Sequence, residues 1–228
     1  MNSWSFAYVT DGFSECIPII MKCGAVKKLV ELLTSDEKNI QTPAVHSVGN
    51  LLAGNDEETQ LLISYGVLPK FATLLNCPNK GMRKEAAWAI SNITAGSREQ
   101  IQAVIVFNLF PTLIEIISNE SAVDLKKEAI WACGNALERG SLAQVQYLID
   151  LGAIIVFCDT LSSHDLQTVL LVLERLAVIL ECATVNDSLD KIMPSIERCG
   201  GLNKVKSLKE HSDDEVVSAA LKVLEFIK

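Results

Sequence analysis

Two short strings in the chain, KEAAWAISNITAG and KEAIWACGN, repeat the same chemically useful residue types at the same spacing. In each string, a glutamate stands three residues before a tryptophan, and an asparagine stands four residues after it. The two tryptophans, Trp88 and Trp131, are 43 residues apart, and so are Asn92 and Asn135. A further asparagine, Asn50, precedes Asn92 by 42 residues.

This combination of side chains could hold an extended basic peptide. An asparagine side chain offers a carbonyl acceptor and an amide donor, so it can pair with the N–H and C=O of a peptide backbone. Tryptophan rings at repeat spacing form slots for the aliphatic stems of lysine or arginine, and the ring faces attract their charged ends. The carboxylates that could receive those charges belong to Glu85, Glu128, Asp56 and Glu138.

The angular positions on a helix place each tryptophan away from the apolar side. At about 100° per residue, Asn92 falls about 40° from Trp88 and Glu85 falls about 60° from it. Ile90 and Ile93 fall on the opposite side of the same helix. The second string, taken as a helix over Leu125–Leu137, repeats this arrangement about its own tryptophan. We therefore predict that both tryptophans line an exposed ladder, although composition alone favours a core position for tryptophan.

A second series of markers indicates that the whole chain is built from similar units. Glycine or asparagine recurs at intervals of 42, 42, 44 and 48 residues, at Gly24, Gly66, Asn108, Gly152 and Gly200. A period of about 40–47 residues is typical of armadillo and HEAT repeats. The segments between breakers follow a helical period and show no strand-like alternation. We predict an all-α, armadillo-type, right-handed superhelical solenoid with about three helices per unit.

The markers divide this single armadillo-repeat domain, residues 1–228, into repeats. Residues 1–12 are interpreted as the last helix of a partial repeat. The full repeats are residues 13–54, 55–96, 97–140 and 141–186, and the terminal repeat is 187–228.

Helix bounds can be predicted most clearly in the second full repeat. We expect helices at Asp56–Tyr65, Leu68–Asn76 and Met82–Thr94, separated by the breakers Gly66–Val67 and Cys77–Gly81. The helix Met1–Thr10 would lack the other helices of its own repeat. We therefore expect it to be poorly anchored, with rapid amide exchange and some self-association.

Composition limits the class of protein. The chain carries 20 Lys+Arg against 28 Asp+Glu, a net charge of -8, which favours basic partners over nucleic acid or an anionic membrane. The 7 cysteines form no CxxC pair, and we interpret them as buried, reduced thiols. The opening string MNSWSFAYVTDG shows no signal peptide, and the apolar-rich stretch Val169–Leu180 is too short to span a bilayer.

The sequence offers little for catalysis. The histidines, His46, His164 and His211, lie in different units, and no HExxH, GxSxG, Walker-type or GxGxxG string occurs. Cys158 precedes His164 by six residues, and we expect the two in a helix and the turn that follows it. We therefore predict a protein that is not an enzyme and that uses no metal or cofactor.

At these residues the chain resembles the importin-alpha (karyopherin-alpha) family of nuclear-import adapters. The resemblance runs from Trp4 to the end of the chain, and WSFAYVTDG, PAVHSVGNLLAGNDEETQ, KEAAWAISNITAG, KEAIWACGN and ERCGGLNKVKSLKEH carry it. It implies an adapter that binds lysine- and arginine-rich nuclear localisation signals in a concave groove, in cytoplasm and nucleus. The repeats present resemble the C-terminal half of the family's array, where its minor site lies.

The resemblance also assigns a peptide-binding site. Carried over residue by residue, the site comprises Asn50, Asp56, Thr59, Glu85, Trp88, Ser91, Asn92, Glu128, Trp131 and Asn135. The segment from Cys199 onward resembles the part of the family that engages the nuclear export receptor. The family's basic N-terminal segment, which binds importin-beta, does not occur in this sequence. The resemblance therefore implies cargo binding without that route to the import receptor.

The chain departs from the family pattern at both ends of the ladder. His46 stands where the ladder expects an aromatic residue, and Tyr8 replaces the first asparagine. Beyond Asn135 the equivalent positions are Glu174 and Val178. The ladder is therefore expected to end after Asn135.

Two other functions stay open. The solenoid could be a structural scaffold that binds an acidic or apolar protein while the ladder is vestigial. It could also be a decoy that binds an export factor or a nucleoporin through the terminal repeat alone. Titration with a basic peptide separates these functions, because only a working ladder should bind it.

Overall fold

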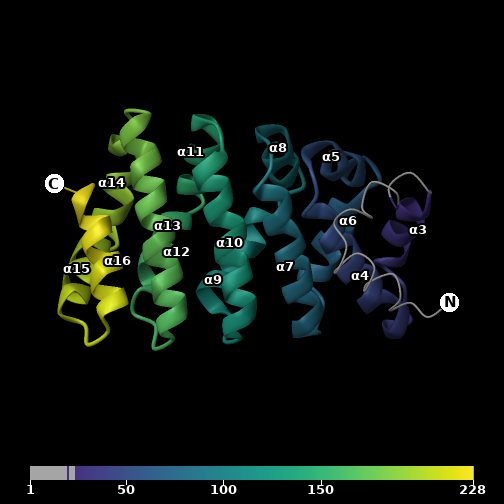
Figure 1. Ribbon diagram of the computed structural model, residues 1–228, viewed down its shortest axis with the longest axis horizontal. Coiled ribbons are helices and arrows are strands. Elements are labelled where there is room, and N and C mark those ends of the chain that lie inside the picture. Colours follow the sequence, from purple (N-terminus) through teal and green to yellow (C-terminus); the bar gives the residue numbers. More distant parts are fainter. Residues whose placement is uncertain (1–19, 21–23, 228) are drawn as a thin grey trace. The chain divides into compact units, whose positions relative to one another are not determined.

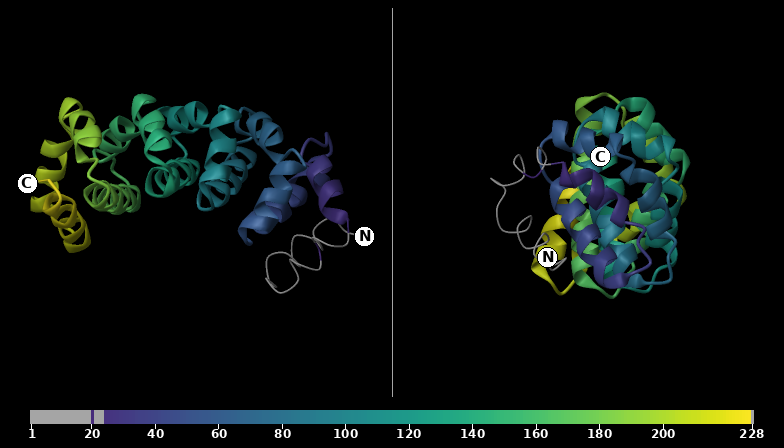
Figure 2. Two further views of the ribbon diagram at one scale, coloured as in Figure 1. Left: turned by 90° about the horizontal axis from the view of Figure 1, so that it is seen from above. Right: turned by 90° about the vertical axis from the view of Figure 1, so that its right-hand side faces the viewer.

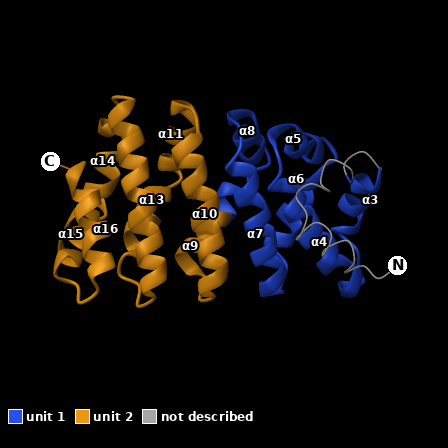
Figure 3. Cartoon of the chain, viewed as in Figure 1, with its two compact units in different colours: residues 1–112 blue, residues 113–228 orange. Residues whose placement is uncertain are grey.

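The computed structural model describes residue 20 and residues 24–227 of the chain. These residues form helices and loops and contain no β-strand, which confirms the predicted all-α fold class. The chain divides into two compact units, residues 1–112 and 113–228 (Figure 3). The predicted helix Met1–Thr10, with Trp4 and Tyr8, lies outside the described residues, so its poor anchoring stays a prediction.

Helices account for most of both units (Figure 1). The described helices of the first unit are α3 (Ala25–Leu32), α4 (Lys38–Leu52), α5 (Asp56–Ser64), α6 (Val67–Leu75), α7 (Lys80–Thr94) and α8 (Arg98–Val106). The helix α9 (Phe110–Asn119) crosses the boundary between the units in the sequence. Those of the second unit are α10 (Val123–Arg139), α11 (Leu142–Asp150), α12 (Ala153–Thr160), α13 (Leu166–Val185), α14 (Leu189–Arg198), α15 (Gly201–Ser207), the 3-10 helix η2 (Leu208–Glu210) and α16 (Asp214–Glu225).

From α5 onward, two shorter helices precede each long helix. The periodic glycine and asparagine markers all adopt a left-handed backbone, which turns the chain between helices. Each glycine directly precedes a short helix, and Asn108 stands two residues before α9. The φ angles are 74° at Gly24, 83° at Gly66, 54° at Asn108, 89° at Gly152 and 67° at Gly200. Glycine adopts a positive φ without steric cost, and asparagine tolerates it better than most residues. The repeat boundaries themselves stay a prediction.

Side-chain caps define where the short helices begin. Asn55, Ser97 and Ser141 each accept a hydrogen bond from the backbone N–H three residues later. The side chain of that later residue accepts one in return, which completes a capping box. These three caps start α5, α8 and α11, so the entry to each repeated set of helices is encoded locally.

Two long helices begin earlier than the sequence pattern predicted. The helix α7 starts at Lys80 because the side chain of Asn79 accepts a hydrogen bond from the Met82 N–H at 3.1 Å. Asn79, interpreted as part of a breaker, is therefore an N-cap. The helix α10 likewise starts at Val123, two residues before the predicted Leu125.

The long helices of each unit pack against one another (Figures 1 and 2), and many of their side chains are buried. In the first unit, α4 and α7 lie side by side, α3 packs on α4, α6 packs on α7, and α5 contacts α8. In the second unit, α13 contacts both α10 and α16, and α12 contacts α14 and α15. Phe71 in the first unit and Phe157 in the second are among the largest fully buried side chains.

The cysteines only partly follow the prediction of buried thiols. All five described cysteines are free, and Cys133 and Cys158 are buried. Burial raises the pKa of both thiols, which disfavours the reactive thiolate at neutral pH. Cys77, Cys182 and Cys199 are only half-buried, because they lie at or near helix ends rather than on the core side of a helix.

No single helix within the described residues is long and apolar enough to cross a membrane. Two helix pairs, α8 with α9 and α11 with α12, reach that length and composition together, across bends of 80° and 62°.

Candidate peptide-binding surfaces on the tryptophan helices

Trp88 lies on the side of α7 that turns away from the core. It is half-buried, whereas Ile90 and Ile93 on the opposite side are completely buried, as the helix angles predicted. The indole packs directly on Gly49 of α4: a Cβ atom at that glycine would stand 2.2 Å from Cζ3 of the ring. Only a residue without a side chain leaves room for the ring there, so Gly49 determines where the indole of Trp88 sits.

His46 of α4 contacts Trp88 and Glu85 of α7 together. Its ring stacks on the indole, with 5.7 Å between the ring centroids and 25° between the planes. Its Nδ1 lies 3.0 Å from Oε2 of Glu85. We call His46, Glu85 and Trp88 the Trp88 cluster. A pocket of about 310 Å³, lined by residues that include Thr42, His46 and Glu85, adjoins this cluster between α4 and α7.

Asn92 forms an internal hydrogen bond as well as bordering the surface. Its Nδ2 donates to the carbonyl oxygen of Gly49 at 3.0 Å. Gly49 stands in the last turn of α4, where backbone carbonyls lack partners within the helix. One amide hydrogen of Asn92 is therefore used to cap the neighbouring helix. Its second amide hydrogen and its carbonyl lone pairs are the groups that could pair with a ligand.

Four other predicted site residues of the first unit differ in exposure. Asp56 is exposed at the start of α5. Thr59 and Ser91 are 3% and 6% exposed, and their hydroxyls donate to the backbone carbonyls of Leu52 and Trp88 at 3.2 and 2.8 Å. Both hydroxyls thus form bonds within the chain. Asn50 is half-buried on α4.

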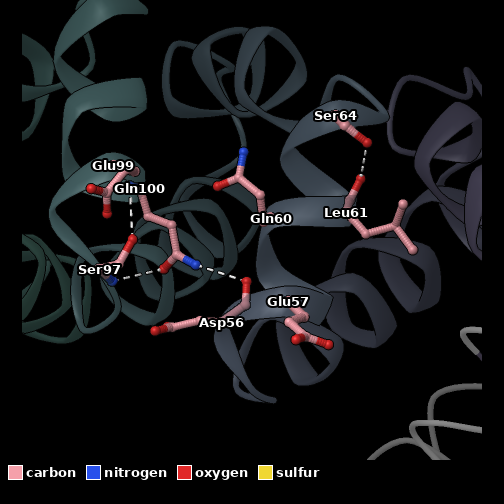
Figure 4. A pocket seen from close by; sticks show the side chains of 8 residues that line it. All are labelled: Asp56, Glu57, Gln60, Leu61, Ser64, Ser97, Glu99 and Gln100. Atoms are coloured by element: carbon pink, nitrogen blue, oxygen red, sulfur yellow. Dashed lines mark hydrogen bonds between the residues drawn. The ribbon is translucent and has the colours of Figure 1, made fainter.

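Asp56 borders a second pocket, between α5 and α8 (Figure 4). The pocket has a volume of about 720 Å³ and three carboxylates in its lining, from Asp56, Glu57 and Glu99. The backbone N–H of Glu99 and the side chain of Ser97 hold the pKa of the Glu99 carboxyl below its usual range, so this group is charged at neutral pH. The side chain of Gln100 donates to the backbone carbonyl of Asp56 at 3.0 Å and joins the two helices.

Trp131 on α10 has a different neighbour. It is 38% exposed, and the guanidinium carbon of Arg175 on α13 lies 4.5 Å from its ring centroid. The same guanidinium donates to Oε2 of Glu138 at 3.0 Å. We call Trp131, Glu138 and Arg175 the Trp131 cluster. The predicted site residues Glu128 and Asn135 are half-buried on the same helix, α10.

Residues 13–53 and 55–95 match the family model "Armadillo/beta-catenin-like repeat", and residues 81–136 match "HEAT-like repeat". The chain is 34% identical to "Importin subunit alpha-8" of Arabidopsis thaliana over 96% of its length. It is 37% identical to "Importin subunit alpha-1b" of Oryza sativa subsp. japonica over 97% of its length. This chain belongs to the importin-alpha family. It spans about half the length of these relatives, 51% of the first and 42% of the second.

Solved structures confirm the armadillo solenoid fold of this importin-alpha chain. A designed armadillo repeat protein in complex with the peptide (KR)4 is 28% identical, with a TM-score of 0.87. The match covers 98% of this chain and 90% of that one. A second designed armadillo repeat protein is 27% identical, with a TM-score of 0.86, and the match covers 99% of this chain and 92% of that one.

Sequence reasoning about this importin-alpha chain missed Arg175. The residue stands in the apolar-rich stretch Val169–Leu180, which was considered only as a possible membrane span, next to the ladder position Glu174. A charged residue within such a stretch was the available signal, since it needs a partner when it is partly buried. His46 was noted only as a departure from the ladder, although it completes the Trp88 cluster. Within residue 20 and residues 24–227, no group of three or more His, Cys, Asp or Glu side chains could hold a metal ion.

Proposed function

We propose that this chain binds extended lysine- and arginine-rich peptides of the nuclear-localisation-signal type along α7 and α10, as a cargo adapter in nuclear import. The observation that carries the proposal is the Trp88 cluster, in which a half-buried indole stacks on His46, and His46 and Glu85 line a pocket between α4 and α7. An aromatic face beside a carboxylate is a general recognition element for a cationic side chain.

Each class of predicted site residue has a separate role in this proposal. Asn50, Asn92 and Asn135 pair with the peptide backbone. The rings of Trp88 and Trp131 hold the stems of basic side chains. Carboxylates take the charged ends, and these are Glu85, Glu128 and Asp56. Thr59 and Ser91 support the surface without direct contact to the peptide, because their hydroxyls donate hydrogen bonds to backbone carbonyls of the chain.

Charge and family membership support this assignment. The net charge of -8 attracts a basic peptide and repels nucleic acid. A structurally similar armadillo repeat protein was solved with the basic peptide (KR)4. Membership of the importin-alpha family points to activity in cytoplasm and nucleus, and to contact of the export receptor with the segment from Cys199 onward.

The expected affinity is modest. An asparagine–backbone pair contributes a net ~0.5–1.5 kcal/mol, and a tryptophan–cation contact contributes ~0.5–2 kcal/mol. Two or three rungs, each of which combines an asparagine–backbone pair with a tryptophan–cation contact, therefore correspond to weak binding with a roughly micromolar Kd. Added salt should weaken binding, because part of the attraction acts between exposed charges.

Isothermal titration calorimetry with one basic signal peptide tests the proposal. Trp88→Ala should weaken binding by about 2- to 30-fold, the equivalent of one tryptophan–cation contact. Phe107→Ala is the matched control, because Phe107 is an aromatic residue of the same unit that is 44% exposed and stands at the end of α8, a helix that carries none of the predicted site residues. Equal affinity for wild type, Trp88→Ala and Phe107→Ala, all folded by circular dichroism, would contradict the proposal.

A scaffold function is the second candidate, and specific contacts favour it. Trp88 already stacks on His46, Trp131 already contacts Arg175, and Asn92 already caps α4. If these contacts serve packing alone, the basic peptide will not bind wild type, and substitutions in the ladder will change only the free energy of unfolding.

A further inference from the structure

We propose that Arg175 acts as an internal ligand of Trp131, and that it closes the ring face that it covers to basic side chains of a bound peptide. The inference rests on the proposed function, because it concerns the selectivity of the same ladder. It makes Arg175 a specificity-determining residue: basic peptide side chains would bind at the Trp88 cluster and would be excluded from the face of Trp131 that Arg175 covers.

The contacts of Arg175 are those expected of a bound basic side chain. Its guanidinium carbon lies 4.5 Å from the centroid of the Trp131 ring, well within the range of about 6 Å for a cation–π contact. One of its nitrogens donates to the Glu138 carboxylate at 3.0 Å. An aromatic face and a carboxylate are also the two groups that the ladder would offer to a lysine or arginine of a peptide. The chain therefore supplies its own cation to both groups.

The position of Arg175 is built into the helices rather than left to a mobile surface side chain. Its side chain is 15% exposed, and that of Glu138 is 27% exposed. The arginine stem passes over Gly134 of α10, where a Cβ atom would stand 2.8 Å from Cδ of the arginine. Glycine thus provides the space through which the stem reaches Trp131. Residues flanking Arg175 on α13, including Leu173 and Leu176, are buried and hold the backbone in place.

A peptide cation could approach this face of Trp131 only by displacing Arg175. Two guanidinium or ammonium groups cannot share one ring face and one carboxylate without repulsion between like charges. The displaced Arg175 would also lose its hydrogen bond to Glu138. However, Nε of Arg175 is buried and has no hydrogen-bond partner within the described residues, so one N–H of the arginine lacks a hydrogen bond in its present position. Removing the arginine should therefore free a site that is already shaped for a cation.

The experiment is a calorimetric titration of (KR)4 at one fixed ionic strength. Wild type is compared with Arg175→Ala, which clears the ring face, and with Arg175→Met, which keeps the stem and removes the charge. The matched control is Arg139→Ala, which removes the same charge from an exposed position on α10. Arg175→Ala should bind about 2- to 30-fold more tightly than Arg139→Ala, the equivalent of one cation–π contact. Arg175→Met should fall between them.

A second measurement needs no peptide. In a background with Trp4→Phe and Trp88→Phe, acrylamide should quench the fluorescence of Trp131 more strongly after Arg175→Ala than after Arg139→Ala. Equal quenching would overturn the inference. A purely structural arginine would not make binding tighter when removed, so weaker or unchanged binding in both Arg175 variants would overturn it as well.

The outcomes separate the inference from the proposed function. If wild type binds (KR)4 and Arg175→Ala binds no more tightly than Arg139→Ala, the inference fails and the proposed function stands. If only the Arg175 variants bind, the inference stands and the ladder of the wild-type chain is not a working peptide site. If neither wild type nor any variant binds (KR)4, both the inference and the proposed function fail.

Discussion

The Trp88 and Trp131 clusters show how one sequence pattern acquires two different surroundings. Both tryptophans follow a glutamate by three residues and precede an asparagine by four. Trp88 is covered from α4, the preceding long helix, by the aromatic ring of His46. Trp131 is covered from α13, the following long helix, by the guanidinium of Arg175. The pattern thus sets the side of the helix, while a neighbour from another repeat sets which ring face a ligand can reach.

The glycines differ in the same way. Gly49 lies on the helix next to Trp88 and contacts the rigid indole itself. Gly134 lies on the same helix as Trp131 and contacts the flexible stem of Arg175. A substitution at the first glycine must move a ring, whereas one at the second must move only an arginine side chain.

The largest expected effect follows from this difference between the glycines. Gly49→Ala should lower the free energy of unfolding by about 1–2 kcal/mol, because the clash with the indole outweighs the helix propensity of alanine. Gly134→Ala should change it by less than about 0.5 kcal/mol, because the arginine stem can shift and the propensity gain of about 1 kcal/mol offsets the loss. Urea unfolding followed by circular dichroism measures both. A Gly134→Ala variant that is the less stable of the two would reverse the comparison.

The helix caps allow a second comparison of the two units. Asn79 caps α7 through the Met82 N–H, and Asp165 caps α13 through the Thr168 N–H at 2.8 Å. Replacing either cap residue with alanine should cost about 1 kcal/mol of stability. Only the Asp165 contribution should depend on pH. The Thr168 hydroxyl and N–H, with the nearby Lys127, hold the pKa of the Asp165 carboxyl below its usual range.

The sign of this pH dependence follows from the lowered pKa. In the unfolded chain the carboxyl titrates near its ordinary pKa of about 3.9. The extra stability of the charged cap is therefore fully present above that pH and is lost as the pH falls through the lower pKa of the folded state. Urea unfolding of wild type and Asp165→Asn between pH 7 and pH 2.5 measures it, since asparagine keeps the cap without the charge. A stability difference that grows below pH 4 would contradict this assignment.

The smallest expected effect concerns the ion pairs of the two clusters. Double-mutant cycles would measure the coupling between Arg175 and Glu138 and between His46 and Glu85 at pH 8. We expect about 1 kcal/mol or less for the arginine pair. The histidine pair should couple more weakly, because arginine carries its charge at any working pH, whereas a histidine is charged only when protonated. A larger coupling energy in the histidine pair than in the arginine pair would contradict this ranking.

Backbone preferences and helix geometry, which depend on nearby residues alone, were enough to predict the fold and the side of the helix on which the ladder residues stand. The spacing of Gly66, Asn108 and Gly152 follows a helical repeat because each adopts a left-handed backbone between two short helices. The angle between Trp88 and Ile90 follows from helix geometry alone. The start of α7 at Lys80 was missed because Asn79 can act as a breaker or as an N-cap, and its hydrogen bond decides which.

The sequence by itself determined the all-α repeat architecture and the side of each long helix on which tryptophan, asparagine and glutamate stand. Those properties depend on residues a few positions apart. Only the tertiary structure decided which side chains meet: His46 with Glu85 across 39 residues, Arg175 with Glu138 across 37, and Asn92 with Gly49 across 43. Such contacts depend on how neighbouring long helices pack. A period describes each residue relative to its own helix axis and carries no information about how far a side chain from the next helix will reach.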